Sequence, residues 1–197
     1  MQPDPSPDPT DEALMERVCA GDEPALGALM GRWEVPLKRF LYRLLLNSAE
    51  AEDLAQETFV KLYLKRAAFC GGARFAPWIL TIAANLARNQ RRWWVRHPTR
   101  SLDAAAPEGA ARPVWEPAET TAGPAEQLLA GERAAAVRGA VAALPHDLRE
   151  VVVLAEFEER SHAEIAEVLG CSAKAVEMRL YRAREKLRKN LSRDSAG

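Results

Sequence analysis

The chain has 197 residues, of which 48% are hydrophobic and 28% charged, as in an ordinary soluble globular protein. This composition excludes wholesale disorder, and the length allows one domain or two small ones. The 27 basic and 28 acidic residues leave a net charge of −1, so the total charge does not indicate a nucleic-acid binder. The absence of any apolar run long enough for a membrane span or a signal peptide predicts a cytoplasmic protein without direct membrane insertion.

The chain begins with a tail, residues 1–10, that is rich in proline and aspartate and is predicted to be disordered. Residues 11–100 form a block dominated by alanine, leucine, glutamate and arginine, without strand-like alternation, so we expect it to be helical. Within this block, Pro36 predicts a kink or a break, because proline cannot donate the helical hydrogen bond. The expected helices cover residues 11–20, 24–46, 50–68 and 77–96.

The third expected helix has a polar, largely acidic side next to an apolar stripe. Leu54, Phe59 and Leu62 have roughly helical spacing and suit a core. An acidic, partly apolar helix fits a protein partner better than it fits DNA, although an ordinary amphipathic surface helix has the same pattern. The polar side carries Asp53, Gln56, Glu57 and Lys61.

The fourth expected helix carries asparagines and arginines on one stripe beside its apolar stripe. Amides one helical turn apart can hydrogen-bond to base edges, and arginines can neutralise phosphates. The preceding loop, from Phe69 to Phe75, is rich in glycine and aromatic residues, which suits stacking on an unstacked base. A core helix with a basic solvent side is the alternative. The polar stripe consists of Asn85, Arg88, Asn89, Arg92 and Arg96.

Residues 101–124 hold four prolines, two glycines and no periodic apolar stripe, which predicts a flexible linker. The segment is acidic, with Arg112 as its one basic residue. It separates two expected domains, residues 11–100 and residues 125–197.

The second block contains a predicted helix-turn-helix. Ser161 and Glu164 form a capping box at the start of a short helix, and Gly170 suits its left-handed C-terminal position. Ser172 can then cap a second helix after a tight turn, the arrangement that places a recognition helix in the major groove. The expected helices of this block cover residues 125–143, 146–157, 161–169 and 173–190.

The last of these helices separates its residues by face. An apolar stripe that includes Val176 and Leu180 must face the core. Seven basic residues lie between positions 174 and 189, and five arginines lie between positions 86 and 100, so the chain has two local basic elements. A solvated surface face is the alternative to DNA contact. The outward face carries Lys174, Glu177, Met178, Tyr181, Arg182, Glu185 and Arg188.

The sequence offers no candidate catalytic or metal site. Cys19, Cys70 and Cys171 are far apart and form no C-x-x-C pair, so neither a disulfide scaffold nor a structural zinc site is expected. No phosphate-binding loop, histidine–carboxylate cluster or nucleophile motif is present. We therefore expect no enzyme activity, no cofactor and no small-molecule substrate.

Three segments, in this order and with this gap, resemble the bacterial RNA polymerase sigma factors of the extracytoplasmic-function (ECF) group. The first is AEDLAQETF at residues 51–59, and the second runs from Trp78 to Asn85. The third begins at Leu144, continues through Glu164-Ile165-Ala166 and ends with RAREKL at residues 182–187. The resemblance covers nearly everything except the tail and the linker.

The resemblance implies a first domain that docks on the clamp coiled coil of core RNA polymerase and melts the −10 promoter element. Asn85 and Asn89 match the family's −10 strand contacts, and the loop from Phe69 to Phe75 matches the one that captures a flipped base. The implied polymerase-facing residues are Asp53, Gln56 and Glu57.

The second domain resembles the one that reads the −35 element. Glu159 stands where the family often has glycine, so the local turn is expected to differ. The implied base-reading residues are Glu177, Met178, Tyr181 and Arg182. The implied phosphate contacts are Arg149, Arg179 and Arg184.

We therefore expect an all-α protein of two small helical domains joined by a flexible linker, the second of them a helix-turn-helix domain. The implied function is that of a sigma factor that binds core RNA polymerase and promoter DNA, with an anti-sigma factor as a further partner. A stand-alone helix-turn-helix regulator is the rival hypothesis. The helix over residues 51–63 and the Asn85/Asn89 pair favour the sigma factor, because the rival needs neither.

Overall fold

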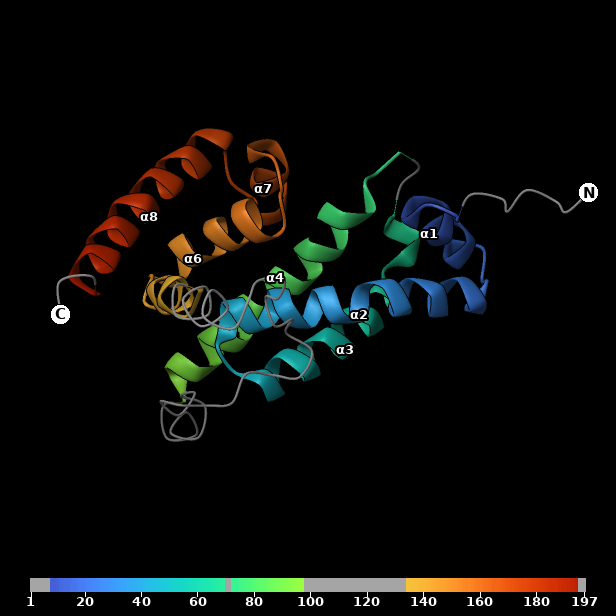
Figure 1. Ribbon diagram of the computed structural model, residues 1–197. Helices are drawn as coiled ribbons and strands as arrows, with labels where there is room; N and C mark the ends of the chain where they lie inside the picture. Colours follow the sequence, from blue (N-terminus) through green and yellow to red (C-terminus); the bar gives the residue numbers. More distant parts are fainter. Residues whose placement is uncertain (1–7, 70–71, 98–133, 195–197) are drawn as a thin grey trace, which may run out of the picture.

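A computed structural model describes residues 8–69, 72–97 and 134–194. Throughout these ranges the regular elements are helices and no strand is formed, which confirms the all-α prediction. Figure 1 shows two groups of helices, which we call the N-terminal module (α1–α4) and the C-terminal module (α6–α8). The expected linker, residues 101–124, and Cys70 lie outside the described residues.

The N-terminal module is built from four helices, and the starts of the first three are capped locally. Thr10, Asp22 and Asn47 each accept a hydrogen bond from a backbone N–H in the first turn of a helix. The bounds of its elements are α1 (Asp11–Cys19), α2 (Glu23–Leu45), α3 (Ser48–Leu64), the 3-10 turn η1 (Arg66–Ala68) and α4 (Phe75–Arg96).

The end of the expected tail is ordered, because Asp8 forms an ion pair with Arg32 at 2.8 Å and Thr10 caps α1. The helix α2 runs through Pro36 without the break that proline allowed. Buried Leu37 and Phe40 follow the proline, so packing outweighs the one hydrogen bond that it removes.

The C-terminal module carries the predicted helix-turn-helix. The capping box between Ser161 and Glu164 is formed, Gly170 adopts a φ of 62°, and Ser172 accepts a hydrogen bond from the backbone N–H of Ala175. Glu159 has a φ of 52°, a left-handed conformation that favours glycine. The elements are α6 (His146–Val152), the π-helical turn η3 (Val153–Phe157), α7 (His162–Leu169) and α8 (Ala173–Asp194), after helical turns at 134–142.

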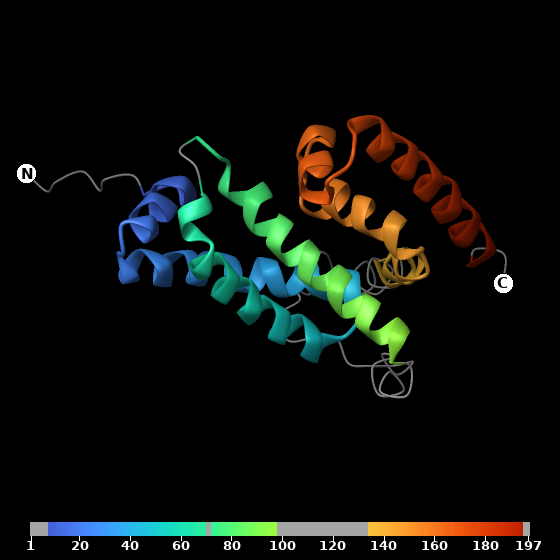
Figure 2. The same cartoon turned by 180° about the vertical axis from the view of Figure 1, so that it is seen from behind.

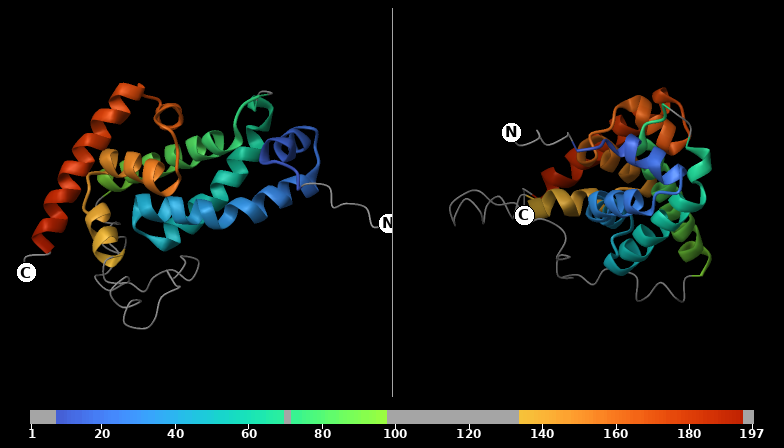
Figure 3. Two further views of the ribbon diagram at one scale, coloured as in Figure 1. Left: turned by 45° about the horizontal axis from the view of Figure 1, so that its top comes forward. Right: turned by 90° about the vertical axis from the view of Figure 1, so that its right-hand side faces the viewer.

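The two modules pack against each other. Helix α7 lies beside α4, and α8 lies on the outer side of the C-terminal module, away from α1 (Figures 1 and 2). The views in Figure 3 place α6 near the end of α2. Buried side chains of both modules belong to one apolar cluster. The modules are therefore in direct contact, which the sequence analysis did not predict.

Candidate nucleic-acid and polymerase interfaces

Helix α8 presents its predicted outward face to solvent. Its core stripe is fully buried at Val176 and Ala183, whereas Tyr181 is 64% exposed and Met178 is 43% exposed. The Lys174 ammonium lies 2.8 Å from a Glu177 carboxylate oxygen, and this hydrogen bond lowers the pKa of Glu177. Glu177 therefore offers a charged acceptor on the same face as an aromatic ring.

The three arginines expected to contact −35 phosphates have different surroundings. The Arg184 guanidinium is exposed and lies 3.3 Å from Glu156. The Arg179 side chain is half-buried and approaches the Cys171 Sγ at 4.0 Å. Both guanidinium groups belong to the surface around α8.

The structure corrects the expected role of Arg149 as a phosphate contact. Its guanidinium donates hydrogen bonds to the carbonyl of Leu44 at 2.9 Å, to that of Leu144 at 3.1 Å and to that of Ala142. Leu44 belongs to the N-terminal module, so Arg149 joins the two modules. The expected phosphate contact by Arg149 is wrong for this conformation, because both terminal nitrogens of its guanidinium are bonded to backbone oxygens.

Helix α4 exposes its two asparagines. The Asn85 Oδ1 accepts a hydrogen bond from Arg88 at 2.9 Å, and the Asn89 Oδ1 accepts one from Arg92. Each asparagine is thus held by the arginine three residues later, and its amide N–H groups remain as donors. Arg96 lies at the exposed end of the same helix and bonds the Arg92 carbonyl at 3.2 Å.

The expected stacking of Phe69 and Phe75 on a base is also corrected by the structure. Phe75 is fully buried and Phe69 is 8% exposed. The Phe75 ring meets Trp33, and the Phe69 ring meets Trp78, in T-shaped edge-to-face contacts with centroid separations of 5.5 and 5.3 Å. The aromatic residues around the loop form core and are not available to stack on a base in this conformation.

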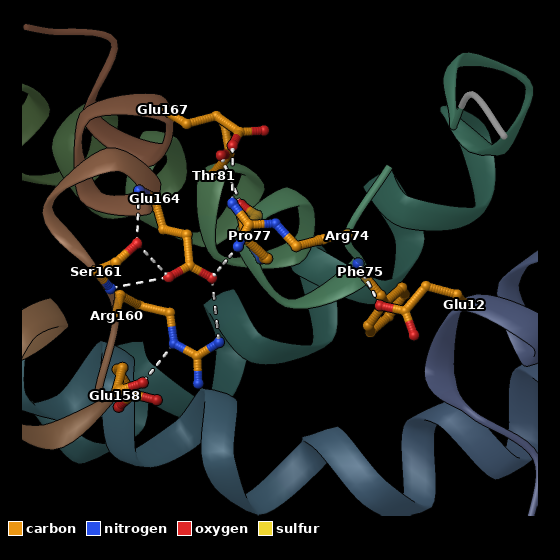
Figure 4. A network of polar contacts seen from close by, with 10 residues as sticks. All are labelled: Glu12, Arg74, Phe75, Pro77, Thr81, Glu158, Arg160, Ser161, Glu164 and Glu167. Carbon is orange, nitrogen blue, oxygen red and sulfur yellow. Dashed lines mark hydrogen bonds and ion pairs between the residues drawn. The ribbon is translucent and has the colours of Figure 1, made fainter. Parts of the chain in front are cut away.

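The start of α4 is held by another helix. Arg74, at the N-cap position, makes no capping hydrogen bond with its side chain. The Glu12 carboxylate of α1 accepts the backbone N–H of Phe75 instead, at 2.9 Å (Figure 4). A non-local carboxylate therefore satisfies a free N–H at this helix start.

Helix α3 exposes the predicted acidic side. Asp53, Gln56 and Glu57 are exposed, and Glu57 lies 3.2 Å from Lys61. Beside them, α2 and α3 form an apolar groove of about 570 Å³. The groove is lined by Leu26, Met30, Glu34, Lys38, Ala55, Gln56, Phe59, Val60, Tyr63 and Leu64.

A buried polar cluster between the modules was missed by the sequence analysis. Glu150 on α6 has a side chain only 5% exposed, and it lies 3.7 Å from Arg88 of α4 and 3.7 Å from His146. Burial raises the pKa of Glu150 to about 7 and lowers the pKa of His146 to about 4. Helical spacing alone could not reveal this cluster, because its partners come from distant segments.

Within the described residues, no group of histidine, cysteine or acidic side chains could hold a metal ion. Cys19 and Cys171 are free thiols. No helix in this described part of the chain is long and apolar enough to cross a membrane.

Two family models match the chain. Residues 29–94 match sigma-70 region 2, and residues 134–187 match sigma-70 region 4. The chain is 33% identical to the RNA polymerase sigma-H factor of Pseudomonas aeruginosa, over 92% of this chain and 93% of that protein. It is also 32% identical to the ECF RNA polymerase sigma-E factor of Haemophilus influenzae, over 89% of this chain and 92% of that protein.

The chain belongs to the ECF sigma factors. As a sigma factor it is a DNA-binding initiation factor that directs RNA polymerase to promoters, and the stand-alone regulator is set aside.

Solved structures agree with this assignment. This ECF sigma factor resembles CnrH, whose structure was solved in complex with the cytosolic domain of CnrY. The TM-score is 0.67, and the sequences are 27% identical over 93% of this chain and 98% of CnrH. It resembles the sigma factor RpoE of Bartonella quintana, solved with the anti-sigma factor NepR, with a TM-score of 0.63 and 26% identity over 81% and 92% of the two chains.

Proposed function

We propose that α8 reads the −35 element in the major groove. The support is the continuous exposed face opposite a buried stripe, on the second helix of a capped helix-turn-helix. The carboxylate of Glu177 suits the amino group of a cytosine, and Arg182 suits a guanine. Arg179 and Arg184 flank this face and suit phosphates. The proposed reading residues are Lys174, Glu177, Met178, Tyr181 and Arg182.

The proposed role of α4 is to hold the −10 strand while the duplex opens. Asn85 and Asn89 are exposed one helical turn apart, and their amide donors suit base edges. Arg92 and Arg96 continue the stripe and suit phosphates. Arg88 lies on the same stripe, but its guanidinium is engaged with the C-terminal module.

The proposed docking surface for core polymerase is the exposed side of α3 with the adjoining α2–α3 groove. Gln56 and the acidic Asp53 and Glu57 supply a polar rim, while exposed Val60 and Leu64 supply apolar area. An apolar centre with a polar rim is typical of a protein–protein interface. A helical, basic partner surface is the chemistry that fits it.

The domain boundaries fit the same proposal: residues 11–100 for polymerase binding and the −10 element, 101–124 as the linker, and 125–197 for the −35 element. The factor acts in the cytoplasm, where the chromosome and polymerase are. It contributes binding and positioning to initiation and performs no catalytic step of its own. An anti-sigma factor is a proposed partner, supported by the complexes of CnrH and of the Bartonella RpoE.

The observation that supports docking most directly is the exposed acidic side of α3, so the test reverses its charge. We expect Asp53→Lys with Glu57→Lys to reduce binding to core polymerase by at least tenfold, because two exposed carboxylates become repulsive. The matched control is Glu16→Lys with Glu159→Lys, which reverses two exposed charges outside α3.

Binding is measured with purified core polymerase, and transcripts made in vitro are sequenced to locate the promoters. Unchanged core binding by the α3 variant, with the control also unchanged, would show that docking uses another surface.

A further inference from the structure

The last two turns of α4 carry aromatic rings that have no part in the proposed function. The Gln90 amide donates a hydrogen bond to Glu50, in the first turn of α3, at 2.7 Å. Beyond that bond α4 continues to Arg96, and its end lies past the ends of α2 and α3 (Figures 1 and 2). The end of α4 therefore projects from the N-terminal module.

The two adjacent tryptophans of this segment make different contacts. Trp94 packs against the apolar core cluster. The Trp93 ring stacks on the imidazole of His97, with a centroid separation of 4.8 Å and an angle of 25° between the ring planes. Because His97 is exposed, the outer ring of this stack faces solvent.

Contacts from the backbone, from Nδ1 and from Trp93 fix the position of the His97 ring. The His97 backbone N–H lies 3.0 Å from the Trp93 carbonyl oxygen and 3.1 Å from that of Trp94. The Nδ1 atom lies 3.0 Å from the same Trp93 oxygen, and it is the donor because a carbonyl can only accept. A ring held in this way loses little conformational entropy when a ligand covers its free face.

Trp93 and His97 continue the row of side chains that begins with the two asparagines. Side chains four residues apart lie on one ridge of a helix. Each interval advances about 6 Å along the helix axis, which exceeds the spacing of about 3.4 Å between stacked bases of one strand. The row therefore suits a strand whose bases are unstacked. It consists of Asn85, Asn89, Trp93 and His97.

Two arginines lie beside the aromatic part of this row. Arg92 and Arg96 are exposed, and both lie within about 100° of Trp93 around the helix. Guanidinium groups bind phosphates whatever the base, and an aromatic ring stacks on any base. The combination of charge and an exposed ring favours a nucleic-acid strand as the ligand of this segment.

We propose that the exposed face of His97, backed by Trp93, is a stacking platform for one unpaired base of the −10 strand. The inference deepens the proposed role of α4 and rests on it. Asn85 and Asn89 bond base edges, and the neighbouring base extends the stack of Trp93 and His97 by one ring. Histidine is among the side chains on which single-stranded bases stack.

The test removes the ring and, separately, the base that the ring would cover. His97→Ala deletes the ring at an exposed position, so the fold is expected to be kept. His97→Phe restores an aromatic ring without the Nδ1 hydrogen bond. The control is Val95→Ala, which shortens a side chain that is 71% exposed in the same turn but on the other side of the helix.

Binding to the holoenzyme is measured by fluorescence anisotropy at one salt concentration. The probe is a labelled single strand that carries the −10 element of a promoter located by sequencing transcripts made in vitro. We expect His97→Ala to weaken binding about five- to tenfold, the lower part of the range for one stacked base. His97→Phe and Val95→Ala should bind as the parent does.

Each base of the probe is then replaced in turn by an abasic site, which keeps the phosphate. We expect one abasic position to weaken binding by the parent about five- to tenfold and to leave binding by His97→Ala unchanged, because that variant has no ring to lose. Abasic sites that affect the parent and His97→Ala equally at every position overturn the platform. Binding by His97→Phe that is as weak as binding by His97→Ala overturns it too.

Asn85→Ala with Asn89→Ala, in the same assay, tests the proposed role of α4 itself. If this asparagine variant and His97→Ala both bind like the parent, the proposed role of α4 fails and the platform fails with it. If the asparagine variant binds weakly while His97→Ala binds like the parent, only the platform is refuted.

Discussion

Tyr181 and Arg182 are the residues whose loss separates DNA reading from folding. Both are exposed on α8, opposite the buried Val176 and Leu180. We expect Tyr181→Ala or Arg182→Ala to weaken −35 binding by about 1–3 kcal/mol, the range for a good base contact. Competition binding of promoter duplex to the holoenzyme at a fixed salt concentration measures the loss.

The matched control for this prediction is Lys186→Ala, which removes an exposed charge from the same helix, one turn beyond the last of the proposed reading residues. Thermal unfolding of all three variants should match that of the parent, because none of these side chains is in the core. Equal promoter binding by the parent and by the Tyr181 and Arg182 variants would contradict the assignment.

Glu150 makes stability depend on pH. Its pKa is raised to about 7 by burial, whereas an unfolded glutamate titrates near its ordinary value of 4.5. Between these values the folded protein binds more protons than the unfolded chain, so this residue's contribution to stability is lost as pH rises from about 4.5 to about 7.

We expect Glu150→Gln to gain stability over the parent as pH rises, by about 1–3 kcal/mol between pH 5 and pH 8. Urea unfolding at the two pH values gives the difference. The pKa of buried His146 is lowered to about 4, so His146 changes the stability only below about pH 6.5, and it does so in both proteins. Comparing the variant with the parent therefore isolates the contribution of Glu150 to stability. The control is Glu156→Gln, which changes an exposed glutamate. If the free energies of unfolding of Glu150→Gln and the parent differ by the same amount at both pH values, the effect is refuted.

At the scale of an element, α4 divides its exposed stripe between two kinds of contact. Asn85 and Asn89 offer amide donors, while Arg92 and Arg96 offer charge. We expect Asn85→Ala with Asn89→Ala to impair open-complex formation more than initial promoter binding, because phosphate attraction does not depend on the amides. Permanganate footprinting should show less melting near −10 while the −35 contact persists. Loss of both contacts together would argue against a role specific to melting.

Elements with local signals could be predicted from the sequence. The capping box at Ser161 and Glu164 and the left-handed Gly170 are set by neighbours within a few residues, and all are confirmed. Phe69 and Phe75 were interpreted wrongly because aromatic residues beside a glycine-rich loop suit a packed core as well as a base. Of the kink or break expected at Pro36, the break does not occur, because the effect of a proline depends on tertiary packing.

At the scale of the whole molecule, the contact between modules has no signature in the sequence. Arg74 and Glu164 are far apart in the chain, and each also fits a purely local role, as a solvated arginine and as a capping residue. Arg149 was assigned to DNA through the family resemblance, yet its guanidinium bonds backbone carbonyls on both sides of the interface. Periodicity predicts which face of a helix is buried, but it does not predict which distant helix covers that face.

The closed arrangement of the modules leads to a prediction about the free factor. The chain carries a net charge of −1, so it lacks the broad basic surface that gives a stand-alone regulator its affinity. Each module offers few phosphate contacts, and Arg88 is already engaged between the modules. We expect the free protein to bind promoter DNA weakly at physiological salt, and core polymerase to convert it into a tight, sequence-specific complex that makes a transcript.

Electrophoretic mobility shift with and without core polymerase measures this conversion, using promoters located by sequencing transcripts made in vitro. The Asp53→Lys and Glu57→Lys variant should lose the gain from core polymerase while leaving the weak binding of the free protein unchanged, because α8 is untouched. Core polymerase would supply the binding free energy that separates the modules and would fix the spacing of α4 and α8 on the two promoter elements. Tight, specific binding by the free protein that core polymerase does not improve would show instead that the modules reach both elements unaided.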